Sequence, residues 1–342
     1  MRSRASQGHP SHRHAAANDR GDGPTAYRAP RWLAGGHAQT IWPYRLQRPV
    51  VALRRERIET PDGDFWDLDW LDADDGAADA PVVVLFHGLE GNSDSHYARA
   101  LLRALAHIGW RGVVPHFRGC SGEPNRLPRA YHSGDHQEIG AMLEAIRRSV
   151  PHPIPLYAVG VSLGGSALLN WLGRAGSSAS QMVTSAAAVS APLDLMAAGV
   201  SIGRGVNRIY TVYFLASLKP KSLAMADRFP GLLDPSRIRR VKTLWDFDDT
   251  VTAPLHGFAG TADYWTRASS KPWLREITVP TLVINARNDP FIPADSLPTP
   301  RDVSGSVTLE QPRDGGHVGF TSGRFPGHVD WLPARLLHYF AS

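Results

Sequence analysis

Short apolar runs recur along the chain, separated by segments whose apolar residues are spaced as on one face of a helix. The runs are rich in Val, Ile, Leu or Ala, as buried strands are, and they occupy residues 81–86, 112–117, 156–159, 186–190, 281–286 and 307–310. After the first run, helical spacing predicts a helix that begins near Ser93 or Ser95 and ends at Gly109. A second helix is predicted at residues 136–148. Strands that alternate with helices predict an α/β fold, with a mostly parallel sheet and helices on both of its faces.

Two stretches interrupt this alternation. Residues 57–60 and 65–70 flank the turn sequence Pro-Asp-Gly and predict an antiparallel hairpin at the edge of the sheet. Residues from about 193 to 277 carry no strand signal, and we expect them to form an inserted helical cap. Within them, residues 206–218 are apolar on too many sides for a solvated helix. These side chains either line a ligand pocket or pack as ordinary core between the cap and the sheet.

The first 30 residues differ from the rest in composition. They mix Arg, His, Ser, Gly and Ala with few large apolar residues, so they cannot bury enough surface to offset the entropy of ordering. We expect residues 1–30 to form a disordered basic leader and residues 31–342 to form one α/β domain. The net charge of the chain is +5, and residues 1–31 contribute +4 of it, with six Arg and two Asp. The remainder is nearly neutral, which argues against a nucleic-acid partner.

Other bulk features concern the cellular setting. The single cysteine, Cys120, excludes an internal disulfide and fits a reducing compartment. No stretch approaches the roughly 18 apolar residues of a membrane span, and the leader lacks the apolar centre of a secretory signal. These features predict a cytoplasmic protein. The basic leader and the cap leave peripheral contact with a membrane open, and the oligomeric state is not encoded in these patterns.

A nucleophile motif, G-x-S-x-G, stands at residues 160–164, where a predicted strand ends and a helix of small residues begins. A sharp strand-to-helix turn strains its central residue, and the flanking glycines let neighbouring backbone pass closely. Ser162 would then present its hydroxyl at the carboxyl edge of the sheet. The backbone N–H of Leu163, at the start of the helix, would face the same point and stabilise a developing oxyanion.

A serine hydroxyl needs a base to take its proton and an acid to orient that base. In α/β-hydrolases the acid and then the histidine follow the serine, each on a loop after a strand. Asp289 and His317 follow the last two predicted strands in that order. We therefore expect Ser162, Asp289 and His317 to form a catalytic triad. The backbone N–H of Leu89, after the first apolar run, is the expected second oxyanion donor.

Other side chains fit these roles less well. His87 lies on the wrong loop for the base, so we expect it to stabilise a turn. Asp248 and Asp249 precede the acid-bearing strand and are expected to anchor the cap or to cap a helix. Asp314 lies too close along the chain to the expected base. Cys120 does not lie in a strand-to-helix turn like that of Ser162 and is expected to be a buried or turn-lining thiol.

Several sequence blocks are more specific than the elbow motif. They are FHGLEG at 86–91, HFRGCSGEPN at 116–125 with YHSG at 131–134, GVSLGG at 160–165, and DPF at 289–291 with GGHVGF at 315–320. Two further blocks support them, at 36–43 and at 247–250 with 253–257. In these blocks the chain, from about residue 31 onward, resembles the YheT-like family of α/β-hydrolase-fold esterases. That bacterial family is related to eukaryotic membrane-associated lipid esterases and acyltransferases. The resemblance implies Ser162 as nucleophile, Asp289 as acid and His317 as base.

Together these features predict a serine hydrolase that cleaves carboxylic esters of short- to medium-chain or lipid-like acyl groups through an acyl-enzyme. An acyltransferase or a thioesterase would use the same acyl-enzyme. A binding protein on the same fold would be expected to have a broken triad. The mechanism requires no cofactor. The fifteen histidines match no zinc-binding spacing, so we expect no catalytic metal.

Overall fold

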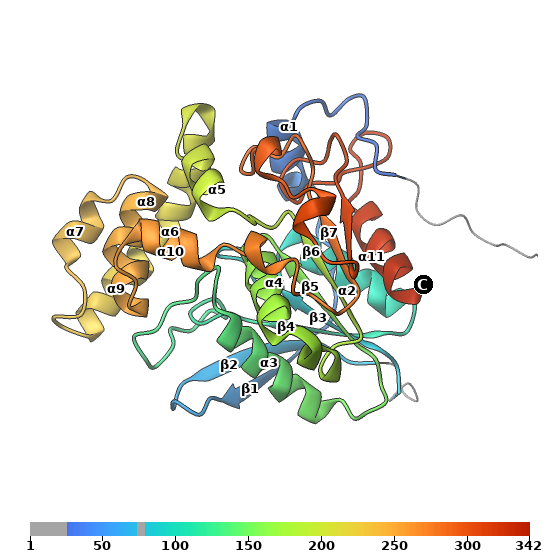
Figure 1. Cartoon of the computed structure of the whole chain (residues 1–342), viewed down its shortest axis with the longest axis horizontal. Coiled ribbons are helices and arrows are strands. Elements are labelled where there is room, and N and C mark those ends of the chain that lie inside the picture. The colour runs from blue at the N-terminus through green and yellow to red at the C-terminus, as the bar shows by residue number, and fades with distance from the viewer. Residues whose placement is uncertain (1–25, 74–78) are drawn as a thin grey trace, which may run out of the picture.

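One sheet of eight strands runs through the computed structural model, which describes residues 26–73 and 79–342 (Figure 1). The strands are β1 (Arg54–Glu59), β2 (Phe65–Leu71), β3 (Val82–Phe86), β4 (Arg111–Pro115), β5 (Leu156–Val161), β6 (Ser185–Val189), β7 (Thr281–Ile284) and β8 (Val307–Glu310). Their order across the sheet is β1-β2-β4-β3-β5-β6-β7-β8. The pairs β1–β2 and β2–β4 are antiparallel, and all the others are parallel. The predicted fold class, with its hairpin at the sheet edge, is confirmed.

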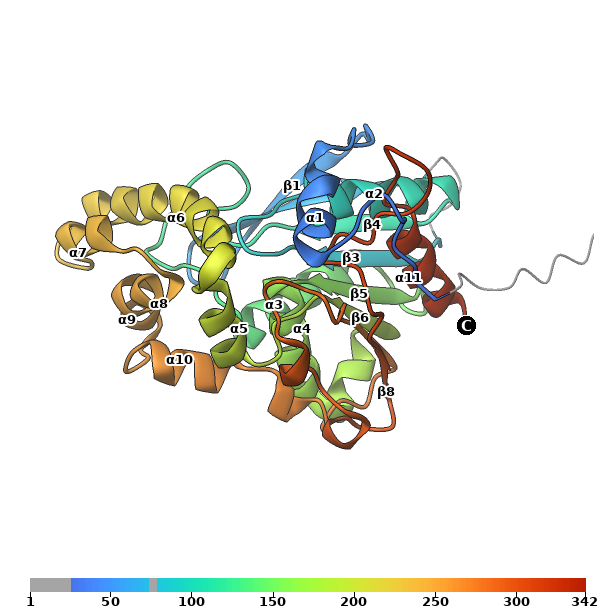
Figure 2. The ribbon, with the colours of Figure 1, turned by 90° about the horizontal axis from the view of Figure 1, so that it is seen from above.

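Helices cover both faces of the sheet, which explains why β3 has no polar position. Val82, Val84 and Phe86 face one helical layer, whereas Val83 and Leu85 face the other, because side chains alternate along a strand. Figure 2 shows the strands between these two layers. The first layer holds α3 (His136–Ser149) and α4 (Leu163–Ala175), and the second holds α2 (His96–His107) and α11 (Trp331–Ala341).

A helical lobe lies between β6 and β7 in sequence and projects beyond one end of the sheet (Figure 1). Its helices are α5 (Leu195–Ile202), α6 (Arg208–Arg228), α7 (Pro235–Arg240), α8 (Leu244–Phe247), α9 (Ala253–His256) and α10 (Thr261–Ala268). The lobe has an apolar core of its own, in which Leu215 and Leu218 of α6 pack against Ile238 and Phe247. This lobe is the cap of the predicted fold class.

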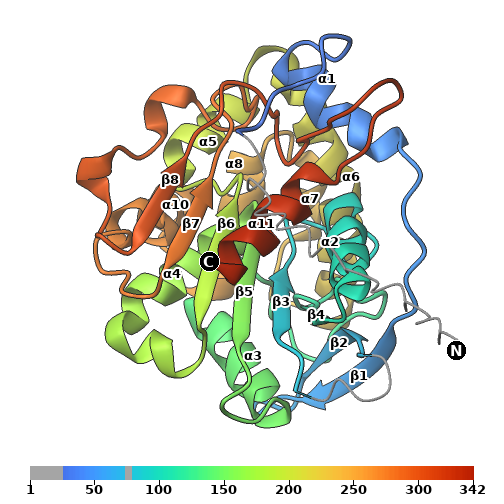
Figure 3. The same cartoon turned by 90° about the vertical axis from the view of Figure 1, so that its right-hand side faces the viewer.

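A short helix, α1 (Gly36–Ile41), and a 3-10 turn (Trp42–Arg45) precede the sheet. Figure 3 shows α1 at the end of the molecule where the loops after β7 and β8 emerge. Of the predicted leader, residues 1–25 lie outside the described residues. Tyr27 is buried, and its hydroxyl donates to the Thr321 carbonyl over 2.7 Å. Within residues 26–73 and 79–342, no helix has both the length and the apolar character needed to cross a bilayer.

Candidate active site

Ser162 occupies the sharp turn between β5 and α4. Its backbone angles, φ 52° and ψ −120°, are rarely adopted by a residue with a Cβ and cost about 1–3 kcal/mol. Two glycines permit the turn. A Cβ on Gly160 would lie 2.6 Å from the Gly164 oxygen, and one on Gly164 would lie 2.4 Å from the His87 oxygen. The elbow therefore packs directly against the loop that follows β3.

Ser162, His317 and Asp289 form a hydrogen-bonded row beyond the carboxyl ends of β5, β8 and β7. The Ser162 Oγ lies 2.9 Å from His317 Nε2, and His317 Nδ1 lies 2.8 Å from Asp289 Oδ2. An ionised carboxylate can only accept, so Nδ1 carries the proton and Nε2 accepts from the serine hydroxyl. The Asp289 side chain is fully buried, and its other oxygen accepts from the backbone N–H of Phe291 over 2.8 Å. The structure thus brings together the three residues that were predicted as a triad.

Neighbouring carboxylates are engaged elsewhere. Asp314 accepts from the Asn288 side-chain amide over 3.1 Å. Asp248 accepts from the Thr252 hydroxyl over 2.6 Å and from the Trp265 indole over 2.7 Å, so it links parts of the cap. Desolvation raises the pKa of Asp248 to about 6. These contacts leave Asp289 as the partner of the histidine.

The peptide between Gly88 and Leu89 is fixed from its carbonyl side. His87 Nε2 accepts from the Phe117 N–H over 3.1 Å, so Nδ1 carries the hydrogen and donates to the Gly88 oxygen over 2.8 Å. The Gly91 N–H donates to the same oxygen over 2.9 Å. Because N–H and C=O point in opposite directions in a trans peptide, these bonds aim the Leu89 N–H away from them. Burial lowers the pKa of His87 to about 3 and keeps its ring neutral, as the acceptor role of Nε2 requires.

Leu89 and Leu163 line the same cavity as Ser162, each on the segment that follows a strand. Leu163 is the first residue of α4, whose N-terminus carries a partial positive charge. The two predicted oxyanion donors therefore lie on the segments that follow β3 and β5, two strands that are neighbours in the sheet.

Glu90 ties this loop to the cap, a role that the sequence did not reveal. It has a positive φ of 56°, and its N–H donates to the Tyr131 hydroxyl over 2.8 Å. That hydroxyl donates in turn to Glu90 Oε1 over 2.9 Å. Lys221 of α6 forms an ion pair with Glu90 Oε2 over 2.7 Å. The available signal was only that Glu90 and Tyr131 lie in two of the family blocks.

Helix α1 holds the loop of the candidate base, which gives the 36–43 block a physical role. The His317 N–H donates to Thr40 Oγ1 over 2.9 Å, and the Gly315 N–H donates to Gln39 Oε1 over 2.8 Å. The approach is close, because a Cβ on Gly36 would lie 1.9 Å from the Asn288 oxygen. Residues far apart in sequence therefore fix the position of the imidazole.

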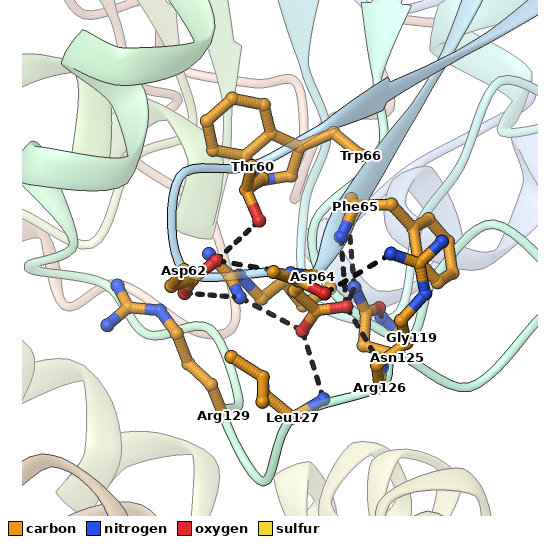
Figure 4. Close-up of polar contacts among 12 residues, drawn as sticks. Thr60, Asp62, Asp64, Phe65, Trp66, Gly119, Asn125, Arg126, Leu127 and Arg129 are labelled. Carbon is orange, nitrogen blue, oxygen red and sulfur yellow. Dashed lines mark hydrogen bonds and ion pairs between the residues drawn. The ribbon is translucent and has the colours of Figure 1, made fainter.

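Arg118 anchors the 116–125 block against the sheet. Its guanidinium donates to Glu138 over 2.7 Å and to Asp64 over 2.9 Å, and all three side chains are buried. Figure 4 shows Asp64 between Phe65, Asn125 and Leu127, and the Asn125 amide donates to Asp64 over 2.9 Å. Charges buried in this way destabilise a protein unless each is paired. The paired block forms one wall of the cavity.

Cys120 belongs to that wall and is buried. Burial raises the pKa of its thiol to about 12, so the sulfur stays protonated and is a poor nucleophile.

A cavity of about 560 Å³ opens onto Ser162 and His317. On the cap side its lining is mostly apolar and includes Ile202, Phe214, Leu218, Met225, Leu244 and Phe247. Phe214 of the apolar segment lines the cavity, as the first interpretation expects, whereas Leu215 packs in the core of the cap itself and not between the cap and the sheet. Tyr213 does neither and is 64% exposed. In the described part of the chain, no cluster of three or more His, Cys, Asp or Glu side chains is placed to hold a metal ion.

Similarity to known proteins bears on this site. Residues 81–323 match the model of the α/β-hydrolase fold family. YheT of Escherichia coli (strain K12), named as a candidate esterase, is 39% identical over 309 residues, which cover 90% of each chain. The human phospholipase ABHD3 is 30% identical over 309 residues, which cover 88% of this chain and 75% of the relative. The predicted resemblance to the YheT-like family is confirmed.

A solved structure shares the fold. The esterase Pf2001 of Pyrococcus furiosus superposes with a TM-score of 0.53, over 85% of this chain and 91% of that chain. Its sequence is 16% identical, so the likeness establishes the fold alone.

Replacing Thr40 by Val removes the oxygen that accepts from the His317 N–H and nearly preserves side-chain size. A partly buried N–H that loses its partner costs up to about 1–3 kcal/mol, so the base should lose its fixed position and kcat/KM for an ester should fall about ten- to a hundredfold. KM should change less, since Thr40 lies outside the cavity lining. Thr266→Val is the matched control, because both hydroxyls donate over 2.7 Å to the carbonyl four residues earlier and Thr266 is exposed. Equal rates for the two variants would contradict the positioning role of α1.

Proposed function

Since the chain belongs to the α/β-hydrolase fold family, we propose that it cleaves carboxylic esters with Ser162 as nucleophile, His317 as base and Asp289 as acid. Its class, ester hydrolase, follows from the family match and from relatives named as esterase and phospholipase. The roles of the individual residues are supported by the unbroken row of hydrogen bonds from Asp289 through His317 to Ser162. That row carries the proposal, because a binding protein on the same fold does not need it.

The reaction proceeds in two steps. His317 Nε2 takes the proton of Ser162 as Oγ attacks the ester carbonyl, and Asp289 stabilises the imidazolium that forms. The oxyanion accepts from the N–H groups of Leu89 and Leu163. When the intermediate collapses, the imidazolium returns its proton to the leaving alcohol and an acyl-serine remains. Water, deprotonated by the same imidazole, then releases the acid and restores the hydroxyl.

The substrate is an ester with a short- to medium-chain or lipid-like acyl group, which lies in the apolar cavity under the cap. The cavity volume of about 560 Å³ is in the range of pockets that enclose a whole small molecule. Water is the acyl acceptor in this proposal. Transfer to an alcohol or a thiol would use the same acyl-serine and would appear as a new ester or thioester when such an acceptor is added.

Removal of the nucleophile tests the proposal. Ser162→Ala should reduce the hydrolysis of p-nitrophenyl esters by about a thousandfold or more, since the remaining groups can only bind and polarise the ester. Ser178→Ala is the control, because Ser178 is exposed and its hydroxyl donates only to the nearby Ala175 carbonyl over 2.8 Å. Wild-type turnover in Ser162→Ala would overturn the assignment.

The acyl pocket can be tested apart from the chemistry. Phe214→Ala enlarges the cavity, so the preferred acyl chain should lengthen by about one or two carbons, because one methylene in an apolar pocket changes kcat/KM by about tenfold or more. The neighbouring Tyr213→Ala should leave the preference unchanged, since Tyr213 faces outward. The measurement is kcat/KM across a series of p-nitrophenyl esters of graded chain length. The same optimum in Phe214→Ala and wild type would exclude Phe214 from the acyl pocket.

A further inference from the structure

The start of α6 has an apolar stripe that no other part of the described chain covers. Ile209, Val212 and Tyr213 recur at helical spacing on its outer side, opposite the buried Tyr210 and Leu215. Val212 is 67% exposed and Tyr213 is 64% exposed. A helix in contact only with water normally has polar residues on this side. Neither the cavity nor the cap core accounts for the stripe.

Exposed apolar side chains of a second segment lie beside it. Six of the eleven large apolar residues that are exposed in the described chain belong to these two segments; they are Ile41, Tyr44, Val206, Ile209, Val212 and Tyr213. We call these six residues the apolar face. Single exposed apolar residues are ordinary, whereas a gathered group marks an interaction surface.

The two segments are in direct contact. His37 of α1 lies 3.0 Å from the Tyr210 hydroxyl of α6, and the two rings are stacked with centroids 5.8 Å apart. Burial raises the pKa of Tyr44, and electrostatic interactions with the Tyr97 and Tyr213 phenols raise it further. Figure 2 shows α1 beside the first turns of α6. The apolar face is therefore made from two neighbouring segments that are far apart in the sequence.

The charged side chains on the two segments of the apolar face all have the same sign. Arg45 and Arg48 are exposed next to Tyr44, and Arg204 and Arg208 are exposed at the start of α6. Neither segment contains a carboxylate, since no Asp or Glu occurs at residues 28–55 or 195–226. Arg48 donates to the carbonyl of Asp94, whose carboxylate is paired with Arg99. Four arginines thus border the apolar face, and the two segments that form this face contain no acidic residue.

We propose that the apolar face docks on an anionic lipid bilayer. An apolar helix side bordered by arginines enters the interface between acyl chains and headgroups, and the positive charges are attracted to anionic headgroups. Phosphate groups suit the planar guanidinium well. A second copy of this chain is the less favourable occupant, because a two-fold contact would place two sets of these four arginines in one interface.

A bilayer docked on the apolar face would lie close to the cavity that holds the acyl group in the proposed function. Vesicle binding itself does not depend on the proposed hydrolysis. Helix α6 carries the stripe on its outer side and lines the cavity through Phe214 and Leu218. Tyr210 packs on Phe291 with ring centroids 4.6 Å apart, and Phe291 packs on His317 with centroids 4.0 Å apart. Tyr210 and Phe291 therefore link helix α6 to the candidate base through two ring contacts.

Vesicle co-sedimentation of the full chain tests the proposal. The wild type and Ser162→Ala should bind vesicles of phosphatidylcholine mixed with phosphatidylglycerol, and both should bind pure phosphatidylcholine less. The double variant Val212→Ser with Tyr213→Ser should bind the mixed vesicles about tenfold less, because it removes two side chains that would enter the interface. Arg204→Gln with Arg208→Gln should lose about fivefold per arginine at low salt, and that loss should shrink at high salt.

Controls keep the outcomes distinct. Ile108→Ser is the matched control, because Ile108 is 45% exposed at the end of α2 and outside the apolar face, so this variant should bind like the wild type. Circular dichroism melting of each variant should match the wild type, which shows that a loss of binding is not unfolding. Equal vesicle binding by the Val212/Tyr213 variant and wild type would overturn the proposal. All variants keep the basic leader, so such binding would be assigned to the leader and not to the apolar face. The proposal would also be overturned if the wild type formed a dimer in sedimentation and did not bind vesicles, and if the Val212/Tyr213 variant were monomeric. That result would assign the apolar face to a second copy of the chain.

Discussion

The hydrogen bond between Ser162 and His317 depends on how the turn of Ser162 and the loop of His317 are held together at the carboxyl edge of the sheet. The two residues are 155 positions apart in sequence, and neither loop is held by its own strand alone. The elbow is forced by close packing of Gly160 and Gly164, and the histidine loop is held by α1. An error of about 1 Å at either end would break a bond of 2.9 Å, so the contacts that hold the two loops are as necessary for this bond as the side chains that form it.

The loop of Leu89, the expected second oxyanion donor, is held by contacts of its own. The neutral ring of His87 and the Gly91 N–H hold the Gly88 carbonyl, and the orientation of the Leu89 N–H follows from planarity of the peptide. The positive φ of Glu90 is offset by its bonds to Tyr131 and by the ion pair with Lys221. Because Lys221 belongs to α6, the ion pair connects the cap to the loop that carries Leu89. A shift of the cap would therefore move this loop, which lies beside Ser162.

Much of the fold could be predicted from local patterns, because each apolar run between turn residues became a strand within a few residues of its expected ends. The order serine, acid, histidine was also visible, since each residue follows a strand. The contacts that hold these residues in place could not be predicted from the sequence. Thr40 and His317 are 277 positions apart, and no periodicity reports a contact between a side-chain oxygen and a distant backbone N–H. The direction of Phe214 and Tyr213 was hidden for another reason: a segment that is apolar on every side does not show which side faces a cavity, a core or the outside.

The central claim is that Ser162 carries the acyl group during turnover. The most direct test is rapid acid quenching during the hydrolysis of a p-nitrophenyl ester, followed by peptide mass spectrometry of the trapped protein. The account predicts that the mass of the acyl group appears on the peptide containing Ser162 and disappears when the ester is exhausted. Acylation of another residue, or turnover without any acylated peptide, would contradict it.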